Sequence, residues 1–214
     1  MLSKVSPVDA GTTFDSVHST MDSAWTQHSF IFIFFMQLGF VLLEAGFIRR
    51  MNAVSIACKN VTDFGVGAIA FWLFGFNFAL GTPECGHADA PFGPETGACA
   101  VPGAAPGVFS GYGQLGGVLW ADQHTAFVFQ LAFAATANTI VSGCCAERIR
   151  FSRYILFSFL NLCFIYPFAV HWFWSGQGWL SAGNPEGRPA IAGYYGAIDY
   201  AGAAVVHFAG ACVG

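Results

Sequence analysis

The stretch that decides the fold is Ala197-Ile198-Asp199-Tyr200-Ala201-Gly202-Ala203-Ala204-Val205-Val206-His207-Phe208-Ala209-Gly210-Ala211-Cys212-Val213-Gly214. It reads as a membrane helix of small and apolar residues that also carries an acid and a histidine. Ionisable side chains at bilayer depth are costly, so they usually face a bundle interior or a water path. Helical geometry places Asp199 and His207 roughly 12 Å apart in rise and about 80° apart around the axis. Both can therefore face one lumen at different depths, and the Gly210–Gly214 spacing lets another helix approach closely.

Composition places the chain among membrane proteins. Of its 214 residues, 55% are hydrophobic and only 9% are charged, whereas about a quarter of a soluble domain is charged. A membrane helix needs about 20 mostly apolar residues. Five windows qualify, namely residues 28–48, 61–81, 124–146, 152–174 and 198–214. The sequence therefore predicts an all-α, polytopic bundle of five membrane helices, preceded by a polar tail over residues 1–27 and a polar connection over 52–60.

The placement of charge predicts an orientation. Basic residues gather between windows one and two and between windows three and four (Arg49, Arg50, Lys59, Arg148, Arg150 and Arg153), whereas residues 82–123 contain none. The positive-inside rule then places those two short connections in the cytoplasm and the N-terminus, 82–123 and 175–197 outside. Most acids fall on the outer side, where they would concentrate cations, although solvated loop charge without a role explains them equally well.

The connection 82–123 holds two cysteines, Cys85 and Cys99. An oxidising outer location makes a disulfide between them the favoured prediction. The run Cys85-Gly86-His87 also resembles metal-ligand chemistry, but its irregular spacing is weak evidence. The sequence therefore predicts no metal site, and it contains no motif for a cofactor.

Several polar and aromatic side chains inside the windows have two interpretations each. Phe129 and Phe133 share a helical face, and simple packing is the usual explanation for such a pair. Trp174 lies at the outer end of its window, where tryptophan is common for lipid reasons, yet its ring can also hold a cation. Gln37 and Glu44 lie seven residues apart and share one face, expected toward protein, and for Glu44 a packing hydrogen bond is favoured over a proton relay.

Enzymatic and nucleic-acid functions find little support. The sequence contains no phosphate-binding loop, dinucleotide fingerprint, zinc-protease helix or nucleophile elbow, and no basic patch for nucleic acid. An intramembrane enzyme would have to use Asp199 and His207 as acid and base, without a nucleophile beside them. We therefore predict a protein that is not an enzyme.

A set of different short motifs is distributed along residues 28–214. They are Phe35-Met36-Gln37-Leu38-Gly39-Phe40, Glu44-Ala45-Gly46, Phe71-Trp72-Leu73-Phe74-Gly75, Phe129-Gln130-Leu131-Ala132-Phe133-Ala134, Ala146-Glu147-Arg148, Tyr166-Pro167, His171-Trp172-Phe173-Trp174, Asp199-Tyr200-Ala201-Gly202 and Val206-His207. Their combination resembles the ammonium transporter family (Amt/Mep, with the Rhesus proteins as distant relatives), closest to its plant-type Amt1 branch. Ala203 departs from the family pattern, which usually has Gly, Ser or Cys there.

The resemblance implies a fold of eleven helices, with two inverted five-helix halves and a last helix, assembled as a homotrimer with a pore in each subunit. On this basis residues 28–214 are expected to be the N-terminal half, incomplete at its C-terminus and without the second pore histidine. The implied setting is the plasma membrane, with the lipid bilayer and ammonium or ammonia as partners and no nucleic acid.

The resemblance also implies roles for five residues. Trp174 resembles the outer cation–π site that recruits ammonium, and Asp199 the buried acid beneath it. Phe129 and Phe133 resemble the two rings that close the outer pore, and His207 the first of twin pore histidines. The implied mechanism is recruitment of ammonium, its deprotonation, and conduction of ammonia, with the proton returned or transferred separately. An ammonium sensor with the same fold is the alternative.

Overall fold

The computed structural model describes residues 10–80, 124–175, 178–182 and 196–214. This part of the chain is helical and has no β-strand, apart from an isolated bridge between Ser181 and Ala197. Four of its helices are long and apolar enough to cross a membrane, Ser16–Phe47, Arg50–Leu80, His124–Cys144 and Phe151–Trp174, and a shorter apolar helix covers Tyr200–Val213. The predicted all-α bundle of several membrane helices is therefore confirmed for the described residues.

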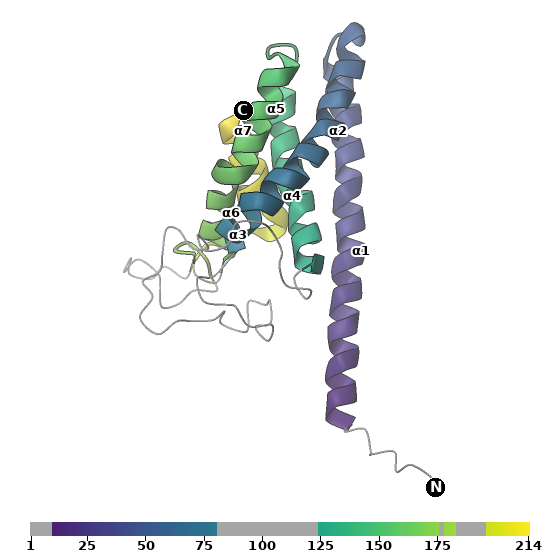
Figure 1. The fold of residues 1–214 in the computed structure, drawn as a ribbon, viewed down its shortest axis with the longest axis vertical. Helices are drawn as coiled ribbons and strands as arrows, with labels where there is room; N and C mark the ends of the chain where they lie inside the picture. The colour runs from purple at the N-terminus through teal and green to yellow at the C-terminus, as the bar shows by residue number, and fades with distance from the viewer. Residues whose placement is uncertain (1–9, 81–123, 176–177, 183–195) are drawn as a thin grey trace.

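The helices follow one another with few interruptions (Figure 1). In chain order they are α1 (Ala10–Phe47), the 3₁₀ turn η1 (Arg50–Asn52), α2 (Ala53–Ala70), the π turn η2 (Phe71–Gly75), α3 (Phe76–Leu80), α4 (His124–Cys144), α5 (Phe151–Leu160), the π turn η4 (Asn161–Ile165), α6 (Tyr166–Trp174), the 3₁₀ turn η5 (Tyr200–Gly202), the π turn η6 (Ala203–Phe208) and α7 (Ala209–Val213). The π turns lie inside continuous helices, which is where such turns usually occur.

The first helix begins at Ala10, well before residue 28. The helix predicted from residue 28 therefore begins within the polar segment expected over residues 1–27. Its apolar residues Phe14, Val17, Met21 and Trp25 continue the three- and four-residue spacing of an amphipathic helix. At 38 residues, α1 is about 57 Å long, which exceeds the bilayer core and agrees with its extension past the other helices in Figure 1.

The connection between the first two helices is much shorter than predicted. Residues 50–60 form η1 and the start of α2, so the polar connection expected over 52–60 is wrong. The polar side chains there stay in a helix because the bundle supplies their partners. Asn60 is 3% exposed and donates to the Glu44 carboxylate at 3.0 Å, and Lys59 is 3% exposed with its ammonium 5.3 Å from the Tyr154 ring centre.

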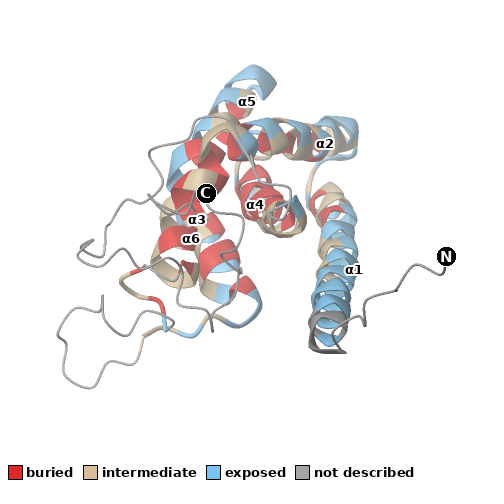
Figure 2. Ribbon diagram, turned by 60° about the horizontal axis from the view of Figure 1, so that its bottom comes forward, coloured by how far each residue is buried: buried red, intermediate tan, exposed pale blue. Residues whose placement is uncertain are grey.

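The buried residues gather around α4, and α1 lies to one side (Figure 2). Only 6% of the most apolar window of α1 is buried, against 56% for α4. The core is built from aromatic and aliphatic side chains of α2, η2, α3, α4, η4, α6 and η6, among them Phe71, Phe76, Leu131, Leu162, Val170, Val205 and Val206. The exposed apolar side chains of α1 suit contact with lipid or with further membrane helices.

The glycines of the last helix lie against α4, as the sequence predicts. A Cβ added at Gly210 would lie 2.8 Å from the carbonyl oxygen of Ala137, and one added at Gly214 would lie 2.7 Å from Cys144 Sγ. Both distances are too short for a real side chain. The small-residue spacing therefore allows the backbones of α4 and α7 to approach closely, which fixes the register of the segment that carries His207.

The predicted polar face of α1 points toward α4. The Gln37 amide donates to Thr136 Oγ1 at 3.2 Å and accepts from Thr139 Oγ1 at 2.8 Å. Glu44 accepts from Asn60 Nδ2 and from Ser142 Oγ, the latter at 3.2 Å. Both residues are buried, so the packing interpretation of Glu44 is confirmed.

A carboxylate joins the two short turns at one end of the bundle. Glu147, whose backbone has a left-handed φ of 61°, accepts from Asn52 Nδ2 at 2.6 Å, from the Arg49 backbone N–H at 2.9 Å and from Arg49 Nε. The Asn52 amide, the Arg49 backbone N–H and the Arg49 guanidinium hold the pKa of Glu147 below its ordinary value of 4.5. Glu147 therefore anchors the turn after α4 to η1.

We expect acid to release this contact. Because the pKa of Glu147 is lower in the folded protein, its carboxylate stabilises the fold fully above pH 4.5, and this contribution is lost as the pH falls through the depressed pKa. Thermal unfolding of wild type and Glu147→Gln, followed between neutral pH and pH 3, checks this. The difference between the two proteins should shrink at low pH, and an unchanging difference would contradict it.

Candidate functional site

The C-terminal end of α6 and the residue before η5 are joined by a hydrogen bond. Trp174 is the last residue of α6, and its indole Nε1 donates to Asp199 Oδ2 at 3.1 Å. Both side chains are partly buried. The indole N–H can only donate, so its bond to the carboxylate fixes the direction of the ring.

The Asp199 carboxylate also holds the start of the last helix. Its Oδ1 accepts from the backbone N–H of Ala204 at 2.8 Å, and its Oδ2 accepts from the N–H of Val205 at 3.1 Å. The first N–H groups of a helix lack partners within the helix, and a carboxylate there is stabilised by the helix dipole. Asp199 is thus an anchor with three donors rather than a free acid in an open path.

Two left-handed residues make this arrangement possible. Ala201 has φ 55° and Gly202 has φ 74°, so the chain turns sharply between Asp199 and η6. A Cβ at Gly202 would lie 2.7 Å from Val206 Cγ2 and 3.6 Å from Trp174 Cη2. A side chain at this position would be strained and would also crowd Val206.

Trp174, Phe133 and Phe129 form a continuous series of three aromatic rings. The centroids of Phe133 and Trp174 lie 5.5 Å apart at 69°, and those of Phe129 and Phe133 lie 5.1 Å apart at 87°. The predicted pair on one face of α4 therefore exists, in edge-to-face rather than parallel contact. Edge-to-face contact is a favoured geometry of aromatic pairs, and here it joins α4 to the end of α6.

His207 lies in η6 and is exposed in this chain. Its neighbours Val205 and Val206 are fully buried, because that side of the last helix packs on the core. Ala203, His207 and Ala211, at four-residue intervals, form the opposite, exposed side. The structure thus places His207 on the same helix that Asp199 anchors, and it places no described side chain over the imidazole.

A buried polar network was missed by reasoning from the sequence. Asp63 is fully buried in α2 and accepts from Tyr154 OH at 2.6 Å, from Asn138 Nδ2 at 2.9 Å and from Ser158 Oγ at 3.2 Å. Asn161 extends the network by donating to Asn138 Oδ1 at 2.9 Å. The signal that could have found it is an acid within an apolar window, which usually marks a buried and partnered group.

A histidine and the cysteines complete the set of candidate ligands. His171 is fully buried, with Nδ1 at 3.0 Å from the carbonyl oxygen of Ala79, so it contributes to the contact between α6 and α3. Cys85 and Cys99 lie outside the described residues, so their disulfide stays a prediction. Within the described ranges, no group of three or more histidine, cysteine or acidic side chains is placed to hold a metal ion.

Comparison with known proteins gives one consistent result. The model of the Ammonium Transporter Family matches residues 24–214. The chain is 36% identical over 204 residues to "Ammonium transporter Amt2" of Archaeoglobus fulgidus, covering 95% of this chain and 39% of that protein. It is also 36% identical over 200 residues to "Ammonium transporter 1 member 3" of Solanum lycopersicum, covering 93% and 38%.

A solved structure is similar as well. The chain of a "Sensor Amt Protein" superposes with a TM-score of 0.63 at 29% identity, over 90% of this chain and 42% of that one. In every one of these three matches, the chain spans about two fifths of the relative's length.

Proposed function

The chain belongs to the ammonium transporter family, and from this premise we propose that the protein carries ammonium or ammonia across a membrane. The observation that carries the proposal is the hydrogen bond from Trp174 to Asp199, because it fixes an aromatic face beside a negative charge at the end of a helix. A cation is attracted to an indole face, and more strongly when it is partly desolvated. An ammonium ion is a cation of suitable size that can also lose a proton.

The first step is capture of the ion at Trp174. Asp199 favours a positive charge there without touching it, since its oxygens already accept from Trp174, Ala204 and Val205. A bare cation pays a large desolvation cost in an apolar passage, whereas neutral ammonia does not. The ion therefore transfers its proton to water before ammonia passes Phe133 and Phe129, and that proton either returns to the solution from which the ion came or is transferred separately. Potassium has no proton to lose, so the same step excludes it.

The second step is passage of ammonia beyond the rings and past His207. A neutral imidazole both donates and accepts hydrogen bonds, so it can guide ammonia and can relay a proton separately. The exposed side of η6 supports this role only if further helices cover it. We propose that an inverted second half of the fold covers it, within an eleven-helix protomer of a homotrimer, and that the N-terminus faces outside at the plasma membrane.

Replacing the two ligand-facing side chains tests the proposal. In cells without their own ammonium carriers, we expect Trp174→Leu to lower the rate of methylammonium uptake by the full-length protein roughly thirtyfold, since a desolvated cation–π contact contributes about 2 kcal/mol. His207→Ala is expected to lower uptake or to change its selectivity against potassium.

The matched controls are Trp72→Leu and His28→Ala. Trp72 lies in η2 with 44% of its surface exposed, and His28 is an exposed residue of α1, so both substitutions remove the same ring elsewhere. Uptake by the controls should match wild type. If Trp174→Leu and His207→Ala also leave flux and selectivity unchanged, the proposed transport path is wrong.

The similarity to a "Sensor Amt Protein" supports a second candidate function. A sensor would use the same Trp174 site to bind ammonium, and binding would change the activity of an attached signalling domain. The two functions differ in a simple measurement, because a sensor binds ammonium without net uptake into vesicles. An appended kinase-like or cyclase-like region in the complete reading frame would favour the sensor.

A further inference from the structure

Two buried oxygen atoms, Glu44 Oε1 on α1 and Asn60 Oδ1 on α2, accept no hydrogen bond from the described residues. Only 6% of Glu44 and 3% of Asn60 is exposed. The other atoms of both groups are bonded, since Glu44 Oε2 accepts from Asn60 Nδ2 and from Ser142 Oγ. Exchanging the amide oxygen and nitrogen of Asn60 does not help, because Nδ2 also donates to the Ile56 carbonyl at 3.1 Å. A buried acceptor without a donor is costly, so both oxygens call for a donor.

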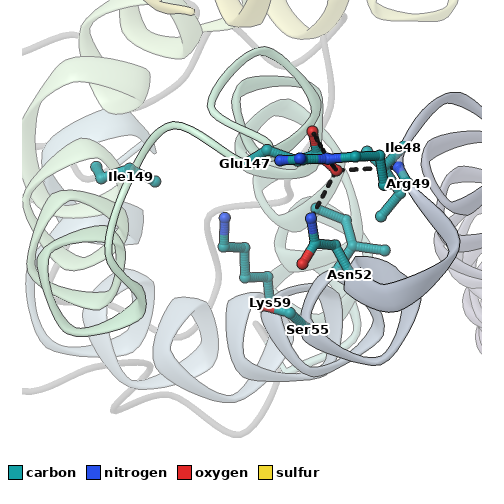
Figure 3. Close-up of a pocket in the computed structure, with 8 residues that line it drawn as sticks. Ile48, Arg49, Asn52, Ser55, Lys59, Glu147 and Ile149 are labelled. Carbon is teal, nitrogen blue, oxygen red and sulfur yellow. Dashed lines mark hydrogen bonds and ion pairs between the residues drawn. The ribbon is translucent and has the colours of Figure 1, made fainter.

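The Lys59 ammonium is a buried donor in the same region. Only 3% of Lys59 is exposed, and its ammonium points into a pocket lined from η1, α2 and the turn after α4 (Figure 3). It lies 5.3 Å from the centre of the Tyr154 ring, and its charge interacts with that of Glu44. The two charged groups do not touch, because the ion pair found among the described residues is Arg49–Glu147. Lys59 and Glu44 are therefore partners across a gap.

One water molecule satisfies all three groups. A polar interaction that is too long for a direct hydrogen bond is commonly bridged by water. A water oxygen can accept from the Lys59 ammonium, while its two hydrogens are donated to Glu44 Oε1 and Asn60 Oδ1. Buried waters typically make about three hydrogen bonds to groups that otherwise lack partners, and the number and polarity of the groups here agree with that.

Electrostatics disfavours other small occupants. A cation on the two oxygens would lie beside the Lys59 ammonium, and like charges repel strongly at short range where solvent screens them poorly. An anion would meet the same difficulty beside Glu44. The pocket next to Lys59 has a volume of about 290 Å³, several times the roughly 30 Å³ that one water occupies in the liquid. Water therefore has both the right charge and a route of entry.

We propose that an ordered water molecule bridges Lys59, Glu44 and Asn60 and completes a buried ion pair between α1 and α2. The Lys59 ammonium donates to this water, and the water donates to Glu44 Oε1 and Asn60 Oδ1. Because Glu44 also accepts from Ser142, the water links three helices at this end of the bundle. The site contains none of the residues of the proposed transport path, so it does not depend on the proposed function.

The first test is a structure of the wild-type, full-length protein at a resolution that shows ordered water. We expect a density peak about 2.7–3.2 Å from Lys59 Nζ, Glu44 Oε1 and Asn60 Oδ1. The peak should keep its height when rubidium replaces sodium and ammonium in the buffer, because rubidium is rich in electrons and would raise a cation peak. A higher peak in rubidium, a direct contact between Nζ and Oε1, or ordered side chains without a peak would overturn the proposal.

Thermal unfolding of the full-length protein gives a second, independent measurement. Lys59→Met and Asn60→Leu each remove one partner of the same water, so the double variant should melt close to the lower of the two single variants. Gln37→Leu is the matched control, because Gln37 is a buried amide of α1 with its own partners on α4. Its shift in melting temperature should add to that of Lys59→Met. Additive shifts for Lys59→Met and Asn60→Leu would contradict a shared water.

Discussion

Asp199→Ala is expected to abolish most ammonium uptake and to destabilise the protein. The substitution removes the acceptor of the Trp174 indole and of the backbone N–H groups of Ala204 and Val205. Hydrogen bonds to a charged group contribute about 1.5–3 kcal/mol each where they are buried, and these are partly buried, so we expect a loss of about 2–3 kcal/mol of stability. The indole would also lose its fixed direction, so uptake should fall more than in Trp174→Leu.

Two comparisons sharpen this experiment. Asp199→Asn keeps the shape but replaces one acceptor oxygen by a donor, so it should lie between wild type and Asp199→Ala in both uptake and melting temperature. Asp22→Ala removes an exposed carboxylate of α1 and should behave as wild type. Initial uptake rates and thermal unfolding of the purified protein measure the two effects. Wild-type values of both in Asp199→Ala would refute the anchoring role.

Asp63→Ala is expected to have the largest effect on stability. The substitution removes the carboxylate that accepts hydrogen bonds from Asn138 Nδ2 and Ser158 Oγ, which are buried. The Tyr154 hydroxyl then donates only to the Asn138 backbone carbonyl, at 3.3 Å. Leaving a buried donor without its acceptor costs about 1–3 kcal/mol, and more than one donor is affected, so we expect a loss of about 3–5 kcal/mol. The melting temperature should fall by roughly 10 °C, given the usual shift of about 2–4 °C per kcal/mol in proteins of this size.

The variant Asp63→Asn distinguishes the contribution of the charge from the contribution of the hydrogen bonds at this position. Asp63→Asn retains an oxygen that accepts from Asn138 or Ser158, and its new amide can donate to the Tyr154 oxygen. We expect it to recover more than half of the lost melting temperature. Fluorescence-detected size-exclusion chromatography after heating gives the comparison. If Asp63→Ala melts at the wild-type temperature, the network contributes little to the fold.

The membrane helices could be read from the sequence because apolar length is a strong signal. Four expected windows coincide with helices of spanning length, and Gly210 and Gly214 lie against α4 as their spacing predicts. The helix boundaries were less predictable. Residues 52–60 look like a connection because they include Lys59 and Asn60, and only the positions of Tyr154 and Glu44 explain why these polar side chains remain in a buried helix.

The candidate site was predictable in its members but not in its contacts. The motifs identify Trp174, Asp199 and His207 through a family resemblance, since isolated tryptophan, acid and histidine residues have commoner structural explanations. The three donors that meet at Asp199 depend on the left-handed turn at Ala201 and Gly202, and no spacing rule places that turn. Asp63 was missed for a related reason, because its partners Asn138, Tyr154 and Ser158 come from two other helices.

The carboxylate shared by Trp174 and the first residues of η6 has a mechanical consequence. The Trp174 indole and the start of η6, the segment that bears His207, bond to the same two carboxylate oxygen atoms of Asp199. Neither can therefore move far without displacing the other. Any rearrangement that tilts the indole is thereby transmitted to the register of His207, over a distance of roughly two helical turns. Trp174 and the first residues of η6 are therefore expected to move together.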